Sequence, residues 1–275
     1  VSLLYAETSA TSSTLNYPVT ATALYELSGN ANDTGNTYNG TATNVEYAYN
    51  GTATNVNFNV AGKFGNAGEF NGSSSKIDLP NGAGSTGAIT VSTWINTNNI
   101  STTQGIWSFG STSGYAVECL IESGYLFFRM LNSSGTAGFG IQTGTGYISN
   151  NTWHNIVCIF PNTTASNACK IYIDGVERIT GTSTLGSVTR NTSNSGLGGR
   201  FYSGSLSLPF TGSIDQIRIF DSALNASQVT QLYNEIQCVP TIVPSESFNT
   251  VLYTGNNSTQ SITGVGFQPD FTWIK

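Results

Sequence analysis

The chain has 275 residues, of which only 9% are charged, and a formal net charge of −6. Its lysines and arginines occur singly rather than in a basic stripe, which argues against nucleic acid as a partner. No run of about 18 apolar residues occurs, so the sequence predicts no insertion into a membrane. Hydrophobic residues still make up 38% of the chain, which indicates a folded protein hydrated by hydroxyl and amide groups.

The N-terminal part is polar, and residues 1–20 are interpreted as a leader or linker. From there on, short runs of alternating apolar residues predict β-strands separated by Gly, Asn, Ser or Pro. These runs are Ala88–Asn96, Gly124–Leu131, Thr152–Phe160, Cys169–Asp174 and Gly212–Phe220. Residues 155–160 are apolar on both faces, which predicts a central strand. The regular spacing of strands favours an all-β, antiparallel, two-sheet jelly-roll sandwich.

One short helix is predicted near the end of this region. Asn225 is placed to cap its first turn, Gln228 stands at the third position of a capping box, and Leu224 can pack onto the helix from outside. Val229, Leu232 and Tyr233 follow at helical spacing. The sequence therefore predicts that residues 225–235 form a helical lid that packs on the sandwich.

The sandwich is predicted to span residues 21–237. A proline-punctuated linker follows at 238–247, and residues 248–275 show further strand patterns. About thirty residues are too few for a core of their own. The tail is therefore interpreted as the start of a second, incomplete β module that folds only with a partner.

Four cysteines are present, and none is in a C-x-x-C pair. One interpretation is that they are buried free thiols. The other is a disulfide between Cys158 and Cys169, because both lie in predicted strands that a hairpin could set opposite each other.

The order of motifs resembles a laminin-G-like, concanavalin A-type jelly roll. The similar segments are YELSGNAND (25–33), GKFGNAGEFNGS (62–73), TVSTWI (90–95), WHNIV (153–157) with KIYIDG (170–175), and FTGSIDQIRIF (210–220). The tail from Phe248 to Lys275 resembles a module of marine bacteriophage structural proteins.

The resemblance implies a calcium ion that ties the opening loop to the last strand. Asp33 and Asp215 are the candidate ligands, since calcium prefers carboxylate and carbonyl oxygens. The alternative is that Asp33 forms an Asx-turn and that Asp215 pairs with a backbone N–H or with Arg218.

The same fold also occurs in glycoside hydrolases, which need two carboxylates about 5–9.5 Å apart. The nearest pair, Glu118 and Glu122, would be about 13 Å apart along one strand, so both are interpreted as solvated charges. His154, the sole histidine, is interpreted as structural. No catalytic residue is predicted, and the chain is expected not to be an enzyme.

These observations favour a non-enzymatic adhesion or structural protein, on a virion surface or extracellular. Its partners would be glycans or neighbouring subunits of an oligomer. The alternatives are a free extracellular carbohydrate-binding module and a glycoside hydrolase of the same fold. No ligand-binding residue can be assigned from the sequence, because most aromatic side chains in such a chain are core.

Overall fold

The computed structural model describes residues 23–25, 27, 51–79, 87–111, 114–131, 137–184, 195–202 and 205–235, together with Thr254 and Ser258. The chain divides into two compact units, one of residues 11–236 and one of residues 1–10 with 237–275. All the secondary structure given below lies in the first unit. Within the described ranges, no helix has the length and apolar character needed to cross a membrane.

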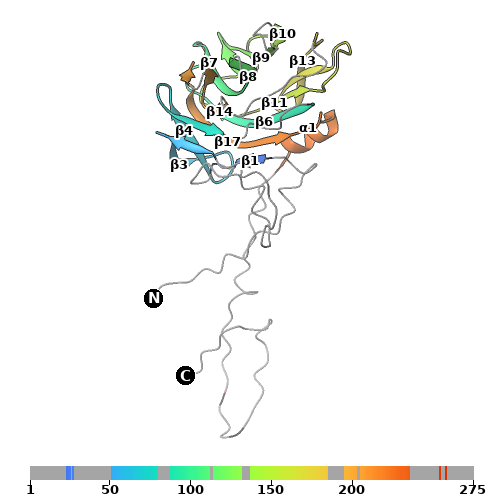
Figure 1. The fold of residues 1–275 in the computed structure, drawn as a ribbon. Helices are drawn as coiled ribbons and strands as arrows, with labels where there is room; N and C mark the ends of the chain where they lie inside the picture. The colour runs from blue at the N-terminus through green and yellow to red at the C-terminus, as the bar shows by residue number, and fades with distance from the viewer. Residues whose placement is uncertain are drawn as a thin grey trace, which may run out of the picture. The chain divides into compact units, whose positions relative to one another are not determined.

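Residues 11–236 form the predicted antiparallel sandwich of two large sheets (Figure 1). The first sheet runs in the order β13-β12-β11-β6-β17-β4-β3, with β1 also paired to β17. Its strands are β1 (Ala23–Tyr25), β3 (Asn57–Ala61), β4 (Asn66–Asn71), β6 (Ile89–Asn96), β11 (His154–Phe160), β12 (Cys169–Ile173), β13 (Val176–Gly181) and β17 (Thr211–Phe220).

The second sheet runs in the order β10-β9-β8-β7-β14-β5-β2. Its strands are β2 (Thr52–Thr54), β5 (Lys76–Leu79), β7 (Gln104–Ser111), β8 (Gly114–Glu122), β9 (Tyr125–Leu131), β10 (Ala137–Gln142) and β14 (Ser195–Leu197). A separate hairpin is formed by β15 (Arg200–Tyr202) and β16 (Ser205–Ser207). The five predicted strands are confirmed, and β11 is central, between β12 and β6.

The core lies between the sheets because successive side chains of a strand point to opposite faces. On β9, Leu126, Phe128 and Met130 are fully buried in the main core. On β11, Ile156, Cys158 and Phe160 belong to the same core. The residues between them on each strand therefore point to the outer face of their sheet, and on β11 these residues, Val157 and Ile159, are themselves buried.

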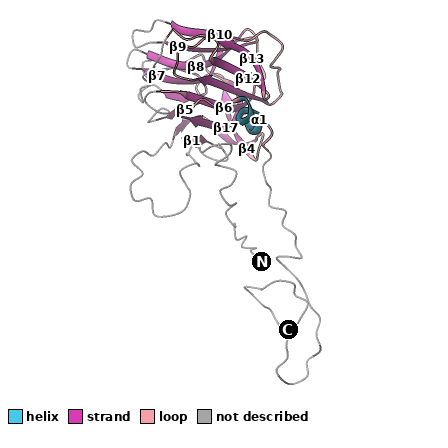
Figure 2. Ribbon diagram, turned by 90° about the vertical axis from the view of Figure 1, so that its right-hand side faces the viewer, coloured by secondary structure: helices cyan, strands magenta, loops and turns pink. Residues whose placement is uncertain are grey.

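The helix α1 (Ala226–Tyr233) packs on the outside of the first sheet, as Figures 1 and 2 show. The predicted capping box is present: Gln228 N donates to Asn225 Oδ1 at 3.0 Å, and Asn225 N donates to Gln228 Oε1 at 2.9 Å. Leu224, Val229 and Leu232 join a second hydrophobic cluster with Val157, Ile159, Tyr172 and Phe220. Tyr233 also stacks on Trp94, with ring centroids 5.8 Å apart.

Two tight turns position the residues considered below. Ser123 and Gly124 have φ of 50° and 84° and join β8 to β9, where Glu122 faces Tyr125. Asp174 and Gly175 have φ of 53° and 76° and join β12 to β13. Positive φ at both central residues is the type I′ geometry, whose twist suits a two-residue hairpin and which Asp-Gly favours.

Candidate functional site

The outer face of β8, β9 and β10 carries a regular grid of side chains. The strand register aligns Glu118 with Arg129 and Gly140 in one row, and Leu120 with Phe127 and Gln142 in the next. A third row pairs Glu122 with Tyr125. Because the alternate residues of β9 fill the core, all of these side chains point away from it. We call this surface the β8–β10 face.

Phe127 is the aromatic centre of the β8–β10 face. Its side chain is partly exposed, and its ring leans over Gly140 of the neighbouring strand. A Cβ at Gly140 would lie 2.9 Å from Phe127 Cζ, so only glycine leaves room for this ring position. The Arg129 guanidinium carbon lies 5.7 Å from the ring centroid. The result is an apolar ring beside a multiple hydrogen-bond donor.

A buried carboxylate fixes two arginines beside this ring. Glu118 is fully buried, and one of its oxygens accepts from Arg129 Nε. Arg200 Nε donates to Glu118 Oε2 at 2.7 Å, and Arg200 Nη2 donates to Oε1 at 3.0 Å. The side chains of Arg129 and Arg200 keep 22% and 19% of their surface exposed. Two arginines whose side chains are partly exposed are therefore held in fixed positions.

Arg200 reaches this site because the β15–β16 hairpin covers the outer face of β7. A Cβ at Gly105 would lie 2.5 Å from Arg200 N, so the two backbones are in close contact. Phe201 N donates to the buried Ser108 Oγ at 2.8 Å, which fixes the hairpin on β7. The hairpin thus contributes Arg200 at one side of the β8–β10 face.

The interpretation of Glu118 as a solvated charge is therefore wrong, whereas Glu122 is exposed as expected. The error has a physical cause: two guanidinium groups replace the water that a buried carboxylate would lose. Part of this was readable in the sequence. A two-residue turn at Ser123–Gly124 sets Glu118 opposite Arg129, while the contribution of Arg200 comes from 82 residues away.

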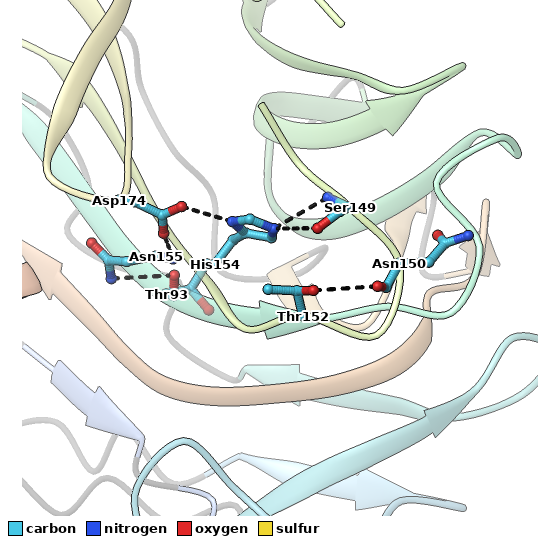
Figure 3. A network of polar contacts seen from close by, with 7 residues as sticks. All are labelled: Thr93, Ser149, Asn150, Thr152, His154, Asn155 and Asp174. Atoms are coloured by element: carbon cyan, nitrogen blue, oxygen red, sulfur yellow. Dashed lines mark hydrogen bonds and ion pairs between the residues drawn. The ribbon is translucent and has the colours of Figure 1, made fainter. Parts of the chain in front are cut away.

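His154 lies in a second polar network, shown in Figure 3. Its Nδ1 lies 2.7 Å from Asp174 Oδ2, and its Nε2 lies 3.1 Å from both the backbone N and the Oγ of Ser149. The Ser149 N–H can only donate, so Nε2 accepts and the neutral imidazole carries its proton on Nδ1, toward Asp174. Asp174 Oδ1 also accepts from Asn155 N at 2.9 Å.

The chain of contacts from Ser149 through His154 to Asp174 has the order of a hydrolytic triad. Such a site also requires N–H donors directed at the oxyanion of the substrate. The backbone N–H of Ser149 is instead directed at the imidazole. The network ties the loop before β11 to the Asp174–Gly175 turn.

Of the two aspartates predicted to bind calcium, one lies in β17. Asp33 lies outside the described residues. Asp215 is fully buried in β17, and its Oδ2 accepts from Phe64 N at 2.9 Å. This contact matches the backbone N–H alternative. Arg218 pairs with Glu235, with Nη2 to Oε1 at 2.8 Å. Across the described part of the chain, no group of three His, Cys, Asp or Glu residues is arranged to hold a metal. Calcium binding therefore stays a prediction.

The predicted disulfide between Cys158 and Cys169 is absent. The β11–β12 register sets Cys158 opposite Ile171, which leaves Cys169 out of register with it. Cys119, Cys158 and Cys169 are buried free thiols, as the alternative interpretation held. Burial raises the pKa of Cys169 to about 11. Burial and the neighbouring Cys119 raise the pKa of Cys158 well above its usual range.

Comparison with known families gives two matches. Residues 71–230 match the model of the concanavalin A-like lectin/glucanases superfamily, and residues 243–275 match a domain of unknown function, DUF7483. No curated protein matches the sequence.

Several solved structures share the fold. Domain 4 of AbnA, an extracellular arabinanase from Geobacillus stearothermophilus, was solved in complex with arabinotriose; it has a TM-score of 0.58 and 24% identity, over 78% of this chain and 98% of that one. The binding domain of botulinum neurotoxin serotype G has a TM-score of 0.56 and 14% identity, over 78% of this chain and 50% of that chain. The serotype D domain, solved with N-acetylneuraminic acid, has a TM-score of 0.51 and 15% identity, again over 78% and 50%. The chain thus spans about half the length of the two neurotoxin domains.

Proposed function

This chain belongs to the concanavalin A-like lectin/glucanase superfamily, and on that premise we propose that its sandwich is a non-catalytic glycan-binding module. The binding surface is the β8–β10 face. The observation that carries the proposal is the partly exposed Phe127 ring, which lies over Gly140 beside the fixed guanidinium of Arg129.

The chemistry of this face suits a sugar. Ligand sites combine apolar area with a few fixed polar groups, and a pyranose or furanose ring offers both an apolar face and hydroxyl groups. Phe127 and Tyr125 supply aromatic area, and Gln142 and the two arginines supply hydrogen-bond donors. Because Glu118 fixes the arginines before a ligand arrives, little side-chain entropy is lost on binding.

Two similar structures support the class of ligand. AbnA Domain 4 was solved with arabinotriose and the serotype D neurotoxin domain with N-acetylneuraminic acid. An extracellular location for this chain is part of the proposal, and it is supported by AbnA Domain 4, which belongs to an extracellular arabinanase.

The absence of catalysis is part of the proposal. Both oxygens of Glu118 are engaged by guanidinium groups, so this carboxylate is not placed to protonate a leaving group. Glu122, its nearest acidic neighbour on the strand, lies two rows away on the same face. Incubation with arabino-oligosaccharides should release no sugar. Release that disappears in Glu122→Gln would overturn this part of the proposal.

Titration calorimetry with arabinotriose and with N-acetylneuraminic acid tests the binding surface. Phe127→Ala should weaken binding at least about tenfold, or about 1.4 kcal/mol. Tyr147→Ala is the matched control, because Tyr147 is also an exposed ring beside an arginine, with Arg178 at 4.6 Å, but lies outside the face. Equal affinities of the two variants would reject the β8–β10 face.

A role on a virion surface, with neighbouring subunits as partners, is a separate proposal for the whole chain. It is supported by the low charge and by the resemblance of the tail to a phage module. Electron microscopy of purified particles, with labelling of this chain, tests it. Calcium binding between Asp33 and Asp215 is likewise a proposal supported only by the family resemblance.

A further inference from the structure

Two thiols from opposite sheets meet in the centre of the sandwich. Cys119 lies on β8 of one sheet and Cys158 on β11 of the other, and their Sγ atoms are 3.7 Å apart. Both are fully buried members of the main core. Among the described residues, no other two cysteines lie this close to each other, since Cys169 lies opposite Gly181 on β13.

From this geometry we propose that Cys119 and Cys158 are a cross-linking site, and that they form an inter-sheet disulfide when the chain folds in an oxidising compartment. The inference does not depend on glycan binding. A disulfide requires an S–S distance of about 2.05 Å, so the two sulfur atoms must approach by about 1.7 Å from their present 3.7 Å. Closing this gap requires a change of side-chain torsion at both cysteines together with a small approach of β8 and β11.

The surroundings favour the bond once it has formed. Cys119 is flanked in its sheet by Trp107 and Phe128, and Cys158 by Val91 and Ile171. These neighbours exclude water and soluble reductants. The same burial means that the thiols cannot react in the closed sandwich, because the nucleophile is the thiolate and must reach its target. The first thiol must therefore react with the oxidant during folding, while it is still accessible, and the second thiol completes the bond as the two sheets come together.

The reaction balances with a low-molecular-weight disulfide as oxidant. One cysteine thiolate attacks the small disulfide, forms a mixed disulfide and releases one small thiolate, which takes up a proton. The second cysteine thiolate then attacks the protein sulfur of the mixed disulfide and displaces the second small thiolate. Two electrons and two protons pass from the cysteines to the oxidant, which ends as two thiols.

The full chain, denatured under reduction and refolded with or without excess glutathione disulfide, tests the proposal. Peptide mapping without reduction should join the peptides that contain Cys119 and Cys158, with a mass loss of two hydrogen atoms. The oxidised protein should melt on the order of 10 °C above the reduced one, because the bond closes a long loop of the unfolded chain.

Matched variants make the outcome decisive. Cys119→Ala and Cys158→Ala should abolish the cross-link and the difference in melting temperature, whereas Cys169→Ala and Cys238→Ala should preserve both. Cys119→Val serves if the alanine variant fails to fold, since it refills the space of the thiol. Four free thiols after oxidative refolding of the wild type, or a bond that joins Cys158 to Cys169, would overturn the proposal.

Discussion

Among single-atom changes on the β8–β10 face, removing the charge of Glu118 should lower the free energy of unfolding of the sandwich the most. Glu118→Gln keeps the size of the side chain but replaces one oxygen by an amide NH₂, which then faces the donors of Arg129 and Arg200. Removing one partner of a buried ion pair costs about 3–5 kcal/mol. The arginine side chains are 22% and 19% exposed, so water replaces part of the lost contact. We therefore expect about 3 kcal/mol.

Urea denaturation followed by tryptophan fluorescence measures this loss directly. For a domain of this size, about 3 kcal/mol corresponds to a decrease in melting temperature of roughly 6–12 °C. Glu122→Gln is the matched control on the same strand and face, and should change the free energy of unfolding by less than about 0.5 kcal/mol because Glu122 is exposed. If Glu118→Gln is as stable as wild type, or if both variants lose equally, the assignment of Glu118 as a buried organising charge is wrong.

Four smaller predictions follow from the same structure. Asn225→Ala should cost about 1 kcal/mol of unfolding free energy by removing the helix cap, and unchanged thermal melting would contradict this. Iodoacetamide should not modify Cys169 in the native protein at neutral pH, because burial raises the pKa of the Cys169 thiol to about 11. Mass mapping of alkylated peptides checks this. Lys170 lowers the pKa of Glu177 by hydrogen bonding. At pH values above the ordinary Glu pKa, the pair should therefore stabilise the fold by at most about 1 kcal/mol, and this stabilisation should be lost as the pH falls through the lowered pKa. In Glu177→Gln the acid limb of the stability–pH curve should flatten. If calcium binds at Asp215, a chelator should lower the melting temperature of the wild type but not of Asp215→Asn, and identical melts of the wild type with and without chelator would reject calcium.

The sequence predicts the fold better than the site because the two depend on different distances along the chain. Alternation along β9, the apolar run at residues 155–160 in β11 and the Asn225 cap are local patterns, and each appears in the structure as predicted. Glu118 and Arg200 meet only because the β15–β16 hairpin folds over β7, and no local pattern records that contact.

The cysteines illustrate the same limit. Cys158 and Cys169 are close in sequence but differ in register by two residues, whereas Cys119 and Cys158 come from different sheets and meet in the core. Sheet-to-sheet packing decides that contact, and alternation only says that each thiol points inward.

NMR mapping of backbone amides during an arabinotriose titration tests most directly whether glycans bind to the β8–β10 face. The largest shifts should occur at Leu120, Phe127 and Gln142, with little change at Val157 and Tyr172 on the outer face of the opposite sheet. Saturable shifts centred on Val157 and Tyr172, or none at any of these positions in the presence of arabinotriose and of N-acetylneuraminic acid, would contradict the claim.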